Sequence, residues 1–282
     1  LGHEFSGRVF RVGEGAAFKE GERVTSAVTG PCGECPECRT GRPNLCGTAF
    51  DHRVWGTWAE YARIPARIVR AGLLRVPDGL SPAAAALLDP LASVLRGLGR
   101  VPDPAGRTAL VLGAGPIALL FTSLLVRRGA ARVLVAGRSP KRLAAHVALG
   151  AEGVSMRESL SSQLRDLTRG LGADIVVETT GVPGIADEAC GLAARGGSVL
   201  LFAGLVREAR LAVLAHRIHY DEVTLVGSFH YTADDARAAL ELLARGEIPT
   251  ERLVTSESPL EKYPFVLERL SRGEEMKVAF LP

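Results

Sequence analysis

The sequence is poor in lysine and in aromatic residues. Only four of its 34 basic residues are lysines, and aromatic side chains make up 5% of the 282 residues. It has neither a run of basic residues nor aromatic residues interleaved with one, the features typical of nucleic-acid binding. With a formal net charge of only +3, nucleic acid is not expected as a partner.

The first residues also lack a targeting signal. The sequence does not begin with methionine, and neither a charged-then-apolar segment nor a transit sequence follows Leu1. Four of the five cysteines are packed into a short segment, which indicates metal binding in a reducing compartment rather than disulfides. We therefore expect a cytoplasmic protein whose front portion is incomplete.

Residues 108–126 contain no charged side chain and are almost long enough to cross a membrane, which takes about 20 apolar residues. Gly113-Ala114-Gly115-Pro116 would break such a helix in its middle. We therefore predict a buried strand, a tight turn and a helix, and no membrane partner. The hydrophobic content of 47% is that of an ordinary globular chain, long enough for two domains.

The turn matches the dinucleotide fingerprint G-x-G-x-x-G/A at Gly113, Gly115 and Ala118. Pro116 suits the first helical turn, where its missing N–H is not needed. Free N–H groups and the helix dipole would meet a pyrophosphate at this point, next to Ile117. Glycine and alanine are abundant in this chain, so a chance match to the fingerprint is easy. The strands and helices expected around the turn therefore decide whether it binds a dinucleotide.

The expected second strand, residues 132–136, ends at Gly137 and Arg138. An acidic residue that holds the ribose 2′-hydroxyl of NAD would stand here, but none is present. Arg138 and Ser139 can instead offer a guanidinium and a hydroxyl to a 2′-phosphate. NADP is therefore favoured over NAD, and a plain turn with a solvated arginine is the alternative.

The spacing Cys-x2-Cys-x2-Cys-x7-Cys is the most specific signal in the chain. Four thiolates so placed can complete a tetrahedral zinc shell, with bonds of about 2.3 Å. Such a closed site predicts a structural zinc that orders a loop with few apolar residues, rather than free or disulfide-bonded thiols. Its ligands are Cys32, Cys35, Cys38 and Cys46.

Strand-like and helix-like segments continue to alternate after the fingerprint. This rhythm predicts an α/β protein with a doubly wound parallel sheet, preceded by a small β-rich domain. Thr180 follows an expected strand, at the end where open α/β sheets bind ligands. The later strands are expected at residues 174–178, 197–202 and 224–228.

Asp89 lies in a helical segment of alanines and leucines, where a carboxylate is costly to bury unless it is paired or binds a cation. A metal ligand is one interpretation, and a helix cap at Pro90 is the other. Residues 65–70 are expected to form a strand. Trp55 and Trp58 either line a pocket or pack in the core. Three histidines in the later part of the chain are treated as structural or surface residues: His216, His219 and His230.

Four motifs together resemble the zinc-containing medium-chain alcohol dehydrogenases, and their order and spacing match over essentially the whole chain. The resemblance is closest to the threonine and polyol dehydrogenases, which have an acidic residue before proline at the Asp89 position. It implies a GroES-like catalytic domain in two pieces, residues 1–91 and 229–282, around a Rossmann domain at 92–228. The motifs are Gly2-His3-Glu4, the four cysteines, Asp89-Pro90 and Gly113-Ala114-Gly115.

The resemblance implies that His3 and Asp89 ligate a catalytic zinc and that Glu4 is a neighbouring or exchangeable ligand. Lys277 matches a basic residue that reaches the cofactor pyrophosphate in relatives. The expected activity is zinc-dependent hydride transfer between a secondary alcohol or polyol, or the matching ketone, and NAD(P). Relatives pair the last Rossmann strand across a two-fold axis, so a homodimer or homotetramer through residues 223–228 is expected.

One part of the family pattern is absent. Family members have a cysteine ligand for the catalytic zinc, and a hydroxyl that starts a proton relay, upstream of Gly-His-Glu. Either the chain is a piece of a longer enzyme, or it is a catalytically impaired remnant that keeps structural zinc and nucleotide binding. A zinc-independent quinone-reductase relative is a third interpretation, which the four cysteines fit poorly.

Overall fold

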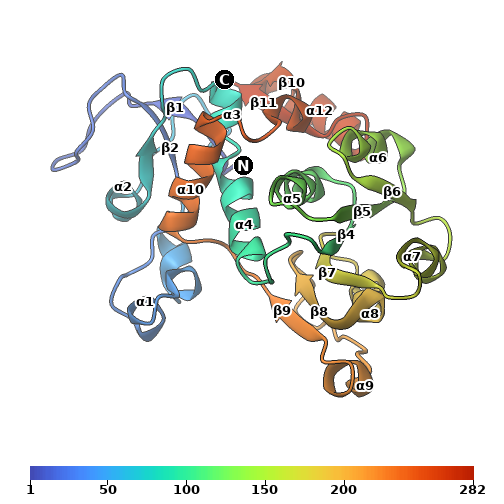
Figure 1. Cartoon of the computed structure of the whole chain (residues 1–282). Helices are drawn as coiled ribbons and strands as arrows, with labels where there is room; N and C mark the ends of the chain where they lie inside the picture. Colours follow the sequence, from blue (N-terminus) through green and yellow to red (C-terminus); the bar gives the residue numbers. More distant parts are fainter. The chain divides into compact units, whose positions relative to one another are not determined.

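The predicted parallel sheet is present in the computed structural model, which describes residues 1–282. Six parallel strands have the order β6-β5-β4-β7-β8-β9, which is the doubly wound Rossmann order (Figure 1). The chain leaves β4 toward one edge and returns to β7, so the order reverses between these two strands. The strands are β4 (Thr108–Leu112), β5 (Arg132–Gly137), β6 (Glu152–Ser155), β7 (Ala173–Glu178), β8 (Ala193–Leu201) and β9 (Thr224–Gly227).

Helices cover both faces of this sheet. Helices α5 and α6 contact each other on one face, and α7 and α8 contact each other on the opposite face (Figure 1). Strand β4 is buried on both sides for this reason, which explains its continuous apolar sequence. The helices are α5 (Pro116–Arg127), α6 (Pro140–Val147), α7 (Leu160–Thr168), α8 (Pro183–Leu192) and the short α9 (Ala215–His219).

The apolar segment around the fingerprint is a strand and a helix, as predicted. Helix α5 has twelve residues, of which Ala118 to Leu125 are all buried. Its apolar side chains therefore pack against the sheet and against the neighbouring helix α6. No helix in the structure has the length and apolar character that a membrane crossing requires.

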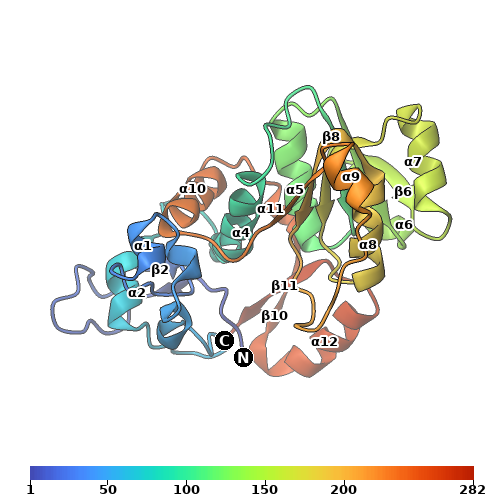
Figure 2. The same ribbon diagram turned by 90° about the horizontal axis from the view of Figure 1, so that it is seen from below.

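The chain divides into two units, residues 97–228 and residues 1–96 with 229–282. The second unit contains a three-stranded antiparallel sheet and the parallel pair β10–β11, beside which α12 lies in Figure 2. Its strands are β1 (Gly7–Arg8), β2 (Arg23–Ser26), β3 (Leu73–Arg75), β10 (Val254–Pro259) and β11 (Lys277–Leu281). Its helices are α1 (Pro36–Arg39), η1 (Pro43–Leu45), η2 (Ala49–His52), α2 (Ala66–Ala71), α3 (Pro82–Ala85), α4 (Leu88–Leu98), α10 (Ala233–Ala244), α11 (Thr250–Leu253), η3 (Leu260–Lys262) and α12 (Tyr263–Ser271).

The prediction of a strand at residues 65–70 is wrong, because Ala66–Ala71 forms helix α2. Pro65 immediately precedes the helix, and Ala66 and Arg67 are strong helix formers. Only Ile68 is fully buried in this helix. The β-branched pair Ile68-Val69 was therefore a misleading strand signal.

Candidate active site

Three side chains of types that bind metals meet in the first unit. Ligand atoms of His3, Glu4 and Asp89 all lie within 4.8 Å of one another. His3 Nε2 and Asp89 Oδ2 are 3.7 Å apart, close to the roughly 3.4 Å that separates two ligands of a tetrahedral zinc with bonds of about 2.1 Å. The donor set of one imidazole and two carboxylates fits a zinc ion.

A close approach of two backbone segments fixes the chain just before His3. Gly2 has a φ of +84°, and a Cβ atom there would lie 2.3 Å from Cδ1 of Trp58. The Gly2 carbonyl accepts hydrogen bonds from the N–H groups of Gly56 at 2.9 Å and Thr57 at 3.2 Å. Only glycine fits this position, so the Gly-His order serves to place the imidazole.

The two tryptophans have different neighbours. Trp55 stacks on His3, with ring centroids 5.3 Å apart and planes 8° apart, and it is 59% exposed. Trp58 packs edge-on against Phe280 at 4.7 Å. Trp55 therefore lies beside a candidate ligand, and Trp58 supports the segment that contacts Gly2.

The Asp89 side chain projects from the first turn of α4, where Pro90 is accommodated without breaking the helix. Burial raises the pKa of Asp89 to about 6, although a hydrogen bond from the Tyr231 hydroxyl at 2.7 Å opposes this shift. The nearby Glu4 carboxylate raises the pKa further, and His3 and Lys277 lower it. A cation between His3 and Asp89 would favour the charged carboxylate, so the electrostatics of the site fit a metal.

Lys277, from β11, forms an ion pair with Glu4, and both side chains are about one quarter exposed. Lys277, which the resemblance links to the cofactor, thus lies beside the candidate metal ligands. Its ammonium balances one of the two carboxylates when Glu4 is not a ligand.

The sequence did not single out Tyr231, which contacts this group, or His230, which precedes it, as site residues. Tyr231 is 3% exposed and bonds to Asp89. His230 Nε2 is 2.6 Å from Thr29 Oγ1, and burial lowers the pKa of His230 to about 4, so its ring is neutral at pH 7. A buried tyrosine hydroxyl needs a partner, but no local pattern identifies Asp89, 142 positions away, as that partner.

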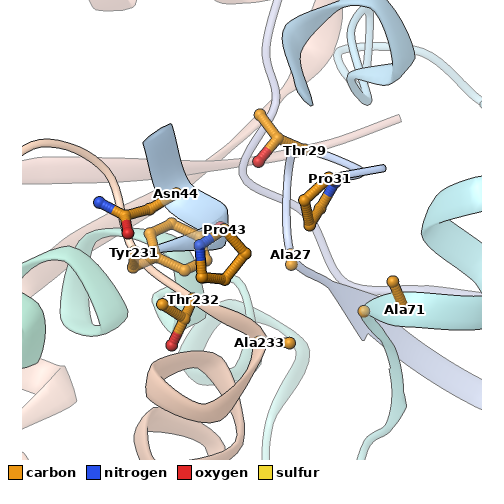
Figure 3. Close-up of a pocket in the computed structure, with 10 residues that line it drawn as sticks. Ala27, Thr29, Pro31, Pro43, Asn44, Ala71, Tyr231, Thr232 and Ala233 are labelled. Carbon is orange, nitrogen blue, oxygen red and sulfur yellow. The ribbon is translucent and has the colours of Figure 1, made fainter. Parts of the chain in front are cut away.

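Figure 3 shows a small cavity behind Tyr231. Thr29, Pro43 and Asn44 line it together with Tyr231, and none of the three candidate metal ligands does. It therefore lies on the side of Tyr231 that faces the cysteine loop, away from the three candidate ligands.

The four cysteines of the loop form a second candidate metal site. Their sulfurs all lie within 4.8 Å of one another, with Cys32 and Cys38 3.9 Å apart, and none is in a disulfide. Although burial opposes it, hydrogen bonds from the Cys32 amide and from Thr48 lower the pKa of the Cys46 thiol to about 6. Four sulfurs this close to one another fit a structural zinc, which binds cysteines in their deprotonated form.

The fingerprint turn in the second unit has the geometry expected of a phosphate-binding loop. Gly113 has a φ of +114°, and a Cβ atom there would lie 2.5 Å from Thr179 Oγ1. Gly115 caps α5, Pro116 is its first residue and Ile117 follows in the first turn. The free N–H groups at this helix end are thus available to a pyrophosphate.

Two further predicted residues lie against this turn. A Cβ atom on Gly137, at the end of β5, would lie 2.7 Å from Ala114 Cβ, so glycine is needed for close packing there. Thr180 Cγ2 lies within 3.2 Å of the Cβ position of Gly113, at the end of β7. Arg138 is exposed. Its carbonyl oxygen accepts a hydrogen bond from Arg157 Nε at 3.2 Å.

Comparison with known proteins agrees with this arrangement. Residues 1–78 match the alcohol dehydrogenase GroES-like domain, and residues 116–245 match the zinc-binding dehydrogenase family. The chain is 36% identical to the D-altritol 5-dehydrogenase of Agrobacterium fabrum (strain C58), over 99% of this chain and 82% of that protein. It is 30% identical to the sorbitol dehydrogenase of Bacillus subtilis (strain 168), over 100% and 80% of the two chains.

A solved structure shows the same fold. The crystal structure described as a zinc-binding dehydrogenase of Sinorhizobium meliloti 1021 bound to NADP superposes with a TM-score of 0.90 at 29% identity. The match covers 100% of this chain and 83% of that one. On these matches and on its Rossmann sheet, the chain belongs to the zinc-containing medium-chain alcohol dehydrogenases and is an alcohol or polyol dehydrogenase.

Proposed function

We propose that the chain catalyses zinc-dependent hydride transfer between the secondary hydroxyl of a polyol and NAD(P), with NADP favoured. The observation that carries this proposal is the 3.7 Å approach of His3 Nε2 to Asp89 Oδ2, with Glu4 alongside. The relatives named for altritol and sorbitol support the substrate class. An impaired remnant is not favoured, because these three side chains are already assembled around one point.

The residues have separate tasks in this proposal. His3, Glu4 and Asp89 would hold a zinc ion, which supplies Lewis acidity for the substrate hydroxyl when it is bound. Trp55 stacks on the imidazole of His3 and restrains its plane, and Lys277 pairs with Glu4 and offsets the charge of its carboxylate. These contacts prepare the ligands before the substrate arrives.

The nucleotide would be held by the second unit. Gly113 and Gly115 allow the backbone to approach the pyrophosphate, and the first turn of α5 at Pro116 and Ile117 presents a helix N-terminus to it. Thr180 borders the same turn. Lys277 is paired with Glu4 in the first unit, and its contact with the pyrophosphate stays a prediction from the resemblance.

The activity test is a screen of the zinc-loaded protein with NADP⁺ and NAD⁺ against altritol, sorbitol, threonine and simple secondary alcohols. We expect reduction of the nicotinamide with at least one polyol and slower rates with simple alcohols. No turnover with any of these substrates, in protein that contains both zinc ions, would contradict the proposal.

Arg138 is proposed to bind the 2′-phosphate of NADP. Replacing Arg138 with alanine should lower kcat/KM for NADP⁺ by about 10- to 100-fold, because a hydrogen bond to a charged group contributes about 1.5–3 kcal/mol. The value for NAD⁺ should stay within about threefold. Steady-state kinetics with both cofactors measure the difference.

The matched control is Arg128→Ala. Arg128 is an exposed arginine at the C-terminal end of α5, away from the fingerprint turn at its N-terminal end. It should change neither value. An equal loss for both cofactors in Arg138→Ala would contradict a phosphate contact. Gly137→Asp is a poor test, because its Cβ atom would collide with Ala114.

We also propose that two copies pair through the β9 edge of the sheet, at residues 223–228. Strand β9 pairs with β8 only, so its outer edge is free to continue the sheet. Light scattering should give a mass of about twice or four times the 29.8 kDa chain. A single-chain mass at micromolar concentration would contradict this assembly.

A further inference from the structure

Residues 229–231 connect the two candidate metal sites of the first unit. Each of the three is held by a residue from the segment that also contains the cysteines. Asn44 Nδ2 donates to the Phe229 carbonyl at 2.9 Å, His230 Nε2 lies 2.6 Å from Thr29 Oγ1, and the Val28 N–H donates to the Tyr231 hydroxyl at 3.0 Å. The position of residues 229–231 therefore depends on the order of that segment.

The Tyr231 hydroxyl has a partner on each side. It accepts from the Val28 N–H and donates to Asp89 Oδ1 at 2.7 Å. The side chain is 3% exposed, so water cannot readily replace either partner. Its single proton is thus directed at the carboxylate, which leaves Oδ2 of Asp89 toward His3 at 3.7 Å.

Asn44 holds this arrangement from the cysteine loop. It lies in η1, two positions before Cys46, and is 5% exposed. Its amide donates to Phe229, and its Oδ1 accepts from Arg96 Nη2 at 3.4 Å on α4, the helix that carries Asp89. Figure 3 shows Asn44 and Tyr231 side by side on the wall of the same small cavity.

The backbone of residues 229–231 has a strained conformation that must be held in place. His230 has a φ of +54°, in the left-handed region that a residue with a Cβ atom rarely adopts. This conformation of His230 turns the chain, so that the Phe229 carbonyl meets Asn44 and the Tyr231 hydroxyl meets Val28. It persists because Asn44 fixes one end and Thr29 fixes the ring of His230.

We propose that Asn44 and Tyr231 are positioning residues for the catalytic metal. Tyr231 orients the Asp89 carboxylate, and Asn44 keeps Tyr231 in place by tying residues 229–231 to the cysteine loop. Order in the four-cysteine site thus strengthens metal binding at His3, Glu4 and Asp89. The inference rests on the proposed function in one respect, that these three residues bind zinc.

Two substitutions of nearly unchanged shape test it. Tyr231→Phe removes the hydroxyl, and Asn44→Asp removes the amide donor while keeping an acceptor for Arg96. Both should weaken zinc binding at the Asp89 site by about 10- to 100-fold in a competition with a chelator. The four-cysteine site should keep its zinc. With cobalt in place of zinc, the visible absorption bands of the Asp89 site should shift.

The controls are Tyr61→Phe, an exposed tyrosine, and Thr40→Ala, whose hydroxyl bonds only within the cysteine loop. Neither should change the affinity or the spectrum. Thermal unfolding of every variant checks that the loop stays folded. If Asn44→Asp unfolds the loop, Tyr231→Phe still tests the contact with Asp89.

The double variant separates the two roles. If Asn44 acts through Tyr231, Asn44→Asp should have almost no further effect in the Tyr231→Phe background. Additive effects would overturn the link between them, and an unchanged affinity in Tyr231→Phe would overturn the inference while leaving the proposed function intact. A parent protein with zinc only at the cysteines would overturn both.

Discussion

Replacing Asp89 with asparagine is expected to remove one of the two zinc ions and to lower kcat/KM by about 1,000-fold or more. Asparagine keeps the size of the side chain and can still accept a bond from Tyr231, but it lacks the charge that makes the carboxylate a strong ligand. A catalytic metal contributes several kcal/mol to the stabilisation of developing charge, and 1.36 kcal/mol corresponds to tenfold in rate. Metal analysis and steady-state kinetics on the same preparation measure both effects.

Asp78→Asn is the matched control, because Asp78 is an exposed aspartate in the same unit. It should retain both zinc ions and the full rate. An Asp89→Asn protein with two zinc ions and an unchanged kcat/KM would show that Asp89 is not a ligand.

Replacing Cys46 with serine is expected to cause the largest loss of stability. The thiolate closes the four-cysteine shell, and the loop around it has few apolar residues with which to order itself. Structural zinc contributes about 10–16 kcal/mol to the folding of small zinc domains, so we expect the free energy of unfolding of the first unit to fall by several kcal/mol. Thermal unfolding and zinc analysis check the result.

Cys190→Ala is the control for this experiment. Cys190 is 2% exposed in the core of the Rossmann sheet and lies outside the zinc cluster. Its replacement should leave the zinc content unchanged and cost about 1 kcal/mol. Equal melting temperatures for Cys46→Ser and the parent protein would contradict a structural metal at the cysteines.

Local sequence patterns were sufficient for part of this molecule. We predicted correctly the strand at Thr108–Leu112, its glycine turn and the helix that begins at Pro116. The signals for these elements are the run of apolar residues, the turn-forming glycines and the proline in the first helical turn, and all of them act within a few residues. The parallel sheet was predicted from the same alternation. The helix at Ala66–Ala71 was missed, because two β-branched residues outweighed the helix formers before them.

The surroundings of the metal ligands could not be predicted in the same way. His3 and Asp89 were identified through resemblance, whereas Asn44, Thr29 and Tyr231 belong to no motif. Their contacts join positions up to 203 residues apart, and a hydrogen bond over such a separation leaves no periodic signal in the sequence. A buried tyrosine next to a left-handed histidine is recognisable only when the fold is known.

The central claim is that His3, Glu4 and Asp89 share one zinc ion. Anomalous X-ray diffraction at the zinc edge, from crystals of the zinc-loaded protein, tests it most directly. We expect two peaks per chain, one among the four cysteine sulfurs and one at about 2.0–2.2 Å from His3 Nε2 and an Asp89 oxygen. A peak at the cysteines alone, or a second zinc that contacts neither His3 nor Asp89, would contradict it.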